Sequence, residues 1–63
     1  MNELMIVLET GHLYYKTESE SAEVAYREFE NVCDNAGINI DNLPIIEAIL
    51  RDEEGYDIDT FTV

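Results

Sequence analysis

The sequence predicts an α+β fold in the order ββααβ, in which a three-stranded, mainly antiparallel sheet carries two helices on one face. Three observations predict this class: two strand-like runs that flank a glycine near the N-terminus, a long apolar stripe at helical spacing, and a shorter stripe after the single proline. With 63 residues the chain has room for one small acidic domain, which we take to span residues 1–63.

Residues 3–17 are predicted to form a β-hairpin. An apolar run of five residues begins at Leu4, and a second strand-like run follows Gly11, which can adopt the positive φ of a tight turn. The first run is apolar on both faces, because Met5 and Val7 point away from Leu4. A strand with one solvated face would alternate apolar and polar residues, so we expect this strand to be central in the sheet.

The next segment is predicted to be the first helix. Thr17 is placed as the N-cap and Glu20 as the third helical residue of a capping box. Apolar residues then recur in steps of three and four, which is typical of a helix with one buried side. The stripe consists of Ala22, Ala25, Tyr26, Phe29, Val32, Cys33 and Ala36. Gly37 is predicted to end the helix in a left-handed conformation, with Ile38 folded back on the last turn.

A second helix is predicted after a short connection. Pro44 suits the first helical turn, where a missing N–H costs nothing. The buried stripe of this helix is assigned to Ile45, Ile46, Ile49 and Leu50. The helix is expected to end before Gly55, and residues 56–63 follow as a terminal strand. The apolar residues of that strand change phase along its length, which indicates a bulge or twist near Thr60.

The charge balance excludes several classes of partner. There are 15 Asp and Glu residues against 3 Lys and Arg residues, which gives a formal net charge of -12. The phosphates of nucleic acids and anionic lipids would meet this charge with repulsion, so we expect no direct contact with nucleic acid and none with a membrane. The apolar runs are also far shorter than the roughly 18 residues that a spanning helix needs. A single cysteine has no partner for an internal disulfide, and we predict a cytoplasmic protein in a reducing compartment.

Residues that carry catalysis are scarce. His12 is the only histidine, and we expect it in solvent beside the hairpin turn. Cys33 is the only cysteine and lies on the apolar stripe, where a free thiol behaves as a small hydrophobic side chain. A Cys33–His12 nucleophile pair would need an exposed, activated thiol. We therefore expect no enzymatic activity, no catalytic residue and no cofactor.

The acids around Gly55 raise the question of a metal site. Hard cations bind oxygen ligands, and a calcium loop places acids at alternating positions before its glycine and a Glu at its end. The acids between Asp52 and Asp59 do not follow that spacing. We expect a self-repelling solvated surface here and no metal.

The excess of negative charge is the feature that is most informative about function. A net charge of magnitude about 2–8 is enough to keep a small domain soluble, and more destabilises the fold by self-repulsion. The excess indicates a basic partner protein. We hypothesise an inhibitor that mimics DNA or RNA by occupying a nucleic-acid-binding surface of that partner, in the style of inhibitors encoded by phages and mobile elements. The acidic surface is assigned to Glu20, Glu23, Glu30, Asp34, Asp57 and Asp59, the last two on one side of the final strand.

A second surface is expected on the sheet face that the helices leave free. Met5 and Val7 fall on that face, and Tyr14 from the neighbouring strand extends it. A chain of this size, without disulfide or metal, gains stability by oligomerisation, so these three residues are assigned to a homodimer contact. The alternative function is a homo-oligomeric structural or regulatory module whose acidic surface serves only solubility.

Overall fold

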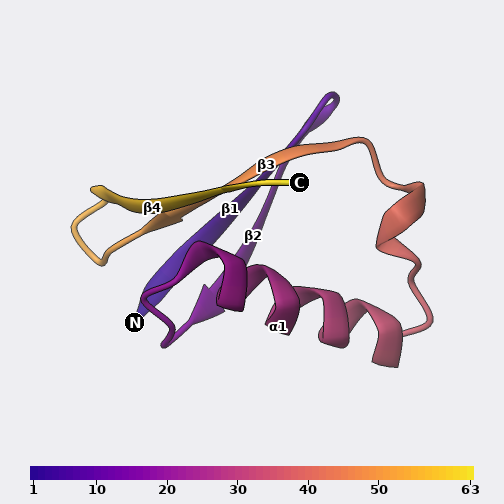
Figure 1. The fold of residues 1–63 in the computed structure, drawn as a ribbon, viewed down its shortest axis with the longest axis horizontal. Helices are drawn as coiled ribbons and strands as arrows, with labels where there is room; N and C mark the ends of the chain where they lie inside the picture. The colour runs from indigo at the N-terminus through magenta and orange to yellow at the C-terminus, as the bar shows by residue number, and fades with distance from the viewer.

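A computed structural model that describes all 63 residues shows one antiparallel sheet of four strands with a single helix packed on one face (Figure 1). The elements are β1 (Asn2–Leu8), β2 (Gly11–Thr17), α1 (Ala22–Asn35), a short 3-10 helix η1 (Ile40–Asn42), β3 (Ile45–Arg51) and β4 (Asp57–Thr62). The strand order is β2-β1-β3-β4. The α+β class is confirmed, but the order is ββαββ, so the predicted order ββααβ, the three-stranded sheet and the second helix are wrong.

The segment that was expected to be a second helix is strand β3. It pairs with β1 on one side and with β4 on the other. Its register against β1 skips Ile46, because Leu8 pairs with Ile45 while Val7 pairs with Glu47. This bulge turns Ile45 toward the same face as Ala48 and Leu50, and the resulting apolar spacing resembles that of a helix.

The N-terminal hairpin is confirmed. β1 and β2 pair from Asn2↔Thr17 to Leu8↔Gly11, and Gly11 has a φ of +152°. β1 also pairs with β3, so its predicted central place in the sheet is confirmed. No helix in the structure has the length and apolar content that crossing a membrane requires.

Helix α1 begins later than the capping box predicts. Ser21 is the N-cap, and its hydroxyl oxygen accepts a hydrogen bond from the Val24 N–H at 3.3 Å. Thr17 is instead a buried residue at the end of β2, and its hydroxyl donates to Glu28 Oε1 at 2.7 Å. The side chain of Thr17 is therefore bonded to Glu28 in the middle of the helix and does not cap the helix N-terminus.

The end of α1 follows the prediction. Gly37 has a φ of +77°, a conformation that glycine adopts without strain. The N–H of Ile38 donates to the carbonyl of Cys33 at 2.8 Å, and the N–H of Gly37 donates to that of Asp34 at 3.1 Å. These two bonds form a Schellman motif, which satisfies carbonyls that the helix leaves free.

The hydrophobic core lies between α1 and the sheet face that it covers, which we call the covered face. Leu4, Ile6 and Leu50 are fully buried there. From α1 the core receives Ala22, Ala25, Tyr26, Phe29 and Cys33. Val32 and Ala36, which were assigned to the same stripe, are exposed, whereas Cys33 between them is buried.

Candidate functional site

One side of α1 carries a row of acids. Glu23, Glu30 and Asp34 are spaced by seven and four residues, which places them on the same side of a helix. Arg27 lies within this row, and its guanidinium is 3.9 Å from Glu23 Oε2 and 3.5 Å from Glu30 Oε1. The same guanidinium lies over the Phe61 ring at 5.6 Å from its centroid, so the only cation of the helix already has three partners.

The N-terminal end of α1 adds two more of the predicted acids. Asp59 on β4 accepts a hydrogen bond from the Ala22 N–H at 2.7 Å, where the helix dipole favours a negative charge. Glu20 is exposed in the loop just before the N-cap. Five of the six predicted acids thus lie on or beside the helix. We call this set the acidic helix surface: Glu20, Glu23, Glu30, Asp34 and Asp59.

Asp57 lies apart from that surface, so the expectation that Asp57 and Asp59 share one side of the strand is wrong. The register places Asp59 opposite Leu50 but Asp57 opposite Arg51. Because Leu50 and Arg51 are neighbours and point to opposite faces, their partners do so too. The bulge occurs at Ile58, two residues before the predicted position near Thr60, and Asp57 pairs with Arg51 at 2.8 Å.

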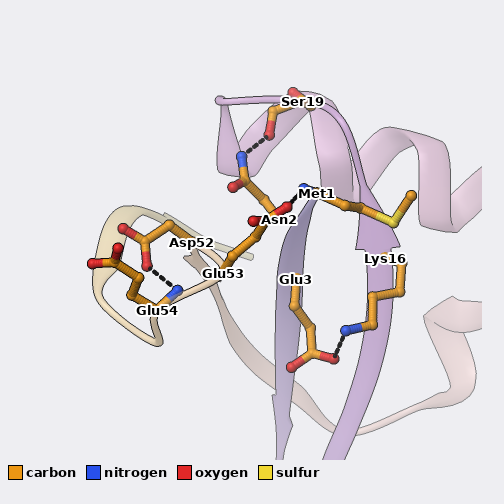
Figure 2. Close-up of polar contacts among 8 residues, drawn as sticks. All are labelled: Met1, Asn2, Glu3, Lys16, Ser19, Asp52, Glu53 and Glu54. Atoms are coloured by element: carbon orange, nitrogen blue, oxygen red, sulfur yellow. Dashed lines mark hydrogen bonds and ion pairs between the residues drawn. The ribbon is translucent and has the colours of Figure 1, made fainter.

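The acids of the β3–β4 turn have local partners. Asp52 Oδ1 accepts hydrogen bonds from the backbone N–H groups of Glu54 at 2.9 Å and Tyr56 at 3.0 Å, which closes the turn. Glu53 accepts a hydrogen bond from the amino group of Met1, and this bond lowers the pKa of Glu53 (Figure 2). An open cleft of about 470 Å³ lies beside these contacts and is lined by Met1, Glu3, Lys16, Arg51, Asp52, Glu53 and Gly55.

The sheet face that α1 does not contact, which we call the open face, carries three rows of four side chains in the order β2-β1-β3-β4. The register assigns Lys16, Glu3, Arg51 and Asp57 to the first row, Tyr14, Met5, Ile49 and Thr60 to the second, and His12, Val7, Glu47 and Thr62 to the third. The charged side chains of this face sum to −1, so the rest of the molecule carries −11 of the total of -12.

The residues assigned to self-association meet on the open face. Met5 pairs with Tyr14 in the register and lies next to Val7 along the strand direction. Met5 is buried by its neighbours yet lies outside the core cluster, whereas Tyr14 is 59% exposed. The prediction missed Ile49, which pairs with Met5 from the other side. Three isoleucines within five residues after Pro44 were the signal for a strand, because β-branched residues favour sheets.

The two candidate catalytic residues do not meet. His12 belongs to the open face, while Cys33 is buried in the core on the covered face. Burial raises the pKa of the Cys33 thiol, which opposes formation of the nucleophilic thiolate. No group of three or more His, Cys, Asp or Glu side chains is arranged to hold a metal ion.

Comparison with protein-family models, with curated proteins and with solved structures finds no match for this chain. The molecule presents two surfaces that differ in charge. The acidic helix surface has a negative charge that its single arginine does not balance. The open face is close to neutral and has an apolar centre.

Proposed function

We propose that the protein is a non-enzymatic binding protein whose acidic helix surface occupies a basic, nucleic-acid-binding surface of a partner protein and thereby inhibits it. The observation that carries this proposal is that five of the six predicted acids lie on α1 or beside its N-terminal end, while the one cation among them is paired with Glu23 and Glu30. A basic partner would meet a net negative row without a free positive charge.

The fold supports this role by fixing the spacing of the charges. Glu30 and Asp34 are four residues apart, a spacing that places the Cβ atoms on a helix about 5–6 Å from each other, and Glu23 lies two turns, about 10 Å, before Glu30. The helix is held at its start by Ser21 and Asp59 and at its end by Gly37, so the row is presented on a rigid element. A pre-organised row loses little conformational entropy on binding, and its field accelerates encounter with an oppositely charged surface.

The test compares two triple variants that change the net charge equally. Glu23→Gln/Glu30→Gln/Asp34→Asn removes charge from the acidic helix surface. Glu9→Gln/Glu18→Gln/Glu54→Gln removes the same charge from exposed side chains elsewhere, none of which makes a hydrogen bond. Basic proteins captured by the wild type at low salt should be lost by the helix variant, retained by the control variant, released at high salt, and displaced by the nucleic acid that they bind.

The alternative, a homo-oligomeric module whose acids serve only solubility, gives a different result in the same experiment. In that case the two triple variants capture the same proteins to the same extent, and nucleic acid displaces none of the captured proteins. Equal behaviour of the two variants would overturn the proposed function.

A further inference from the structure

We propose that two copies of this chain associate through their open faces, about a two-fold axis that runs parallel to the strands. In this arrangement β2 of one copy lies opposite β4 of the second, and β1 lies opposite β3. The proposal is independent of the proposed function, because it uses the face opposite to the acidic helix surface.

The charged row of the open face is complementary to itself when a second copy is turned about the strand direction. Across β2, β1, β3 and β4 the signs alternate as plus, minus, plus and minus. The residues in that order are Lys16, Glu3, Arg51 and Asp57. An alternating row of four read in the reverse order has the opposite sign at every position. A second copy turned about the strand direction therefore sets Lys16 against its Asp57 and Glu3 against its Arg51.

Within each copy, two ion pairs already hold the charged side chains of this row side by side. Lys16 Nζ lies 3.1 Å from Glu3 Oε2, a contact drawn in Figure 2, and Arg51 pairs with Asp57 at 2.8 Å. Within one copy, however, Lys16 and Asp57 lie on the two outer strands and do not meet. A direct contact between these two side chains can therefore form only between copies.

The middle row supplies the apolar contact. The same axis sets Met5 against Ile49 of the second copy, and Tyr14 against Thr60. Aromatic residues and methionine are enriched in interface cores. The third row is less complementary, because Glu47 comes opposite Val7 of the second copy.

The other face-to-face arrangement, with the axis across the strands, fits the charges less well. It would set Arg51 against Glu47 of the second copy but Lys16 against His12, and it would leave Glu3 opposite Val7. Only one type of ion pair forms there, whereas the axis along the strands provides two.

The distribution of charge permits the approach of two acidic copies. Two chains at -12 each bring −24 together, but only −1 per copy lies on the open face. The helices are on the outer sides of the resulting αββα arrangement. Packed layers are about 10 Å apart, so the two acidic helix surfaces are separated by more than the screening length of about 8 Å at physiological salt.

The size of the face predicts a weak dimer. Four strands about 4.8 Å apart, each contributing about six residues at about 3.4 Å, give roughly 400 Å² per copy. That is about a tenth of the accessible surface of 4074 Å². It is half of the ~800 Å² per partner in a standard interface, a size at which an association is weak and transient.

The experiment is a charge exchange between the two outer strands, read by sedimentation from low micromolar to near-millimolar protein. Lys16→Glu alone places two acids opposite each other across the interface, because residue 16 faces Asp57 of the second copy. Asp57→Lys alone places two lysines opposite each other in the same way. Each should weaken the dimer about tenfold or more. An equimolar mixture of the two variants should form a heterodimer, and Lys16→Glu/Asp57→Lys should recover the homodimer.

Controls with the same charge change off the face are Arg27→Glu and Glu18→Lys, and circular dichroism verifies that each variant is folded. These controls should not reproduce the tenfold loss. The proposal is overturned by a wild type that stays monomeric over the whole range, by a dimer that ignores both single variants, or by single-variant losses that neither the mixture nor the double variant restores.

Discussion

The two faces of the sheet are built from the same strands but differ in what they contact. On the covered face, Leu4 and Ile6 of β1 are fully buried beneath α1. On the open face the same strand presents Glu3 and Val7, and its neighbours present charged and aromatic side chains. Alternation along the strand thus separates two roles: one face holds the fold together, and the other, which the helix does not cover, carries the proposed contact between molecules.

The sharpest test of this division is a pair of neighbouring residues in β3. Leu50→Ala removes a fully buried side chain from the covered face and should cost about 2–5 kcal/mol, which is a large part of the stability of a domain this small. Ile49→Ala, on the open face, should cost far less in the monomer, because Ile49 is outside the core cluster. Urea unfolding at low protein concentration measures both, and equal losses would contradict the division.

A second pair lies on either side of the bulge in β4. Asp59→Ala removes the carboxylate that accepts from the Ala22 N–H, and loss of such a bond at a helix start costs about 1 kcal/mol. Asp57→Ala breaks only an exposed ion pair with Arg51, so stability should change little. Thermal unfolding of the two variants in dilute solution compares them. If Asp57→Ala lowers the melting temperature more than Asp59→Ala does, the bulge does not separate the roles of the two acids.

The covered face should also respond to alkaline pH. Burial raises the pKa of Cys33 above its ordinary value of 9.0 and that of Tyr26 above 10.0. Groups whose pKa is raised by folding stabilise the protein fully below the unfolded pKa, and this contribution disappears as pH rises through the folded pKa. Stability should therefore fall as pH increases beyond about 9. Cys33→Ala should reduce this dependence and cost on the order of 1 kcal/mol at neutral pH.

Thiol labelling gives an independent check on Cys33. At neutral pH a thiol reagent should react slowly with the folded protein and quickly in denaturant, since the side chain is buried in the core. Rapid labelling of the native protein would mean that the covered face opens readily.

The smallest expected effect is that of salt on thermal stability. With 15 acidic and only 3 basic side chains, the acids repel one another in the compact state, and screening relieves this repulsion. The melting temperature should rise between about 10 mM and about 500 mM NaCl, over which the screening length falls several-fold. A flat or falling curve would show that the acids outside the open face are already balanced by local pairs.

The charged row on the open face was hidden from sequence analysis for a specific reason. Its members come from four strands, and two of them, Arg51 and Asp57, lie in or after a segment that was interpreted as a helix. If β3 is not in the sheet, the row ends at Lys16 and Glu3, and the alternation of positive and negative charges across four strands cannot be seen. Alternation across strands is a property of register, and register depends on which strands pair.

The sequence by itself determined the local elements whose signals are complete within a few residues. The hairpin follows from two short apolar runs around Gly11, and the main helix from its stripe and the stop at Gly37. The assignment of Met5 and Val7 to the face opposite Leu4 follows from strand periodicity alone.

Only the tertiary structure decided whether residues 45–51 form a helix or a strand, and to which face of the sheet Asp57 and Asp59 point. The apolar spacing of this segment fits a helix or a bulged strand, and pairing with both β1 and β4 selects the strand. The bulge at Ile58 then separates Asp57 from Asp59, because one extra residue reverses the side to which a strand points its next side chain. The isoleucines of this segment favour a strand locally, but the strands with which it pairs are set by long-range contacts. For that reason the place of β3 in the sheet and the charged row of the open face required the folded chain.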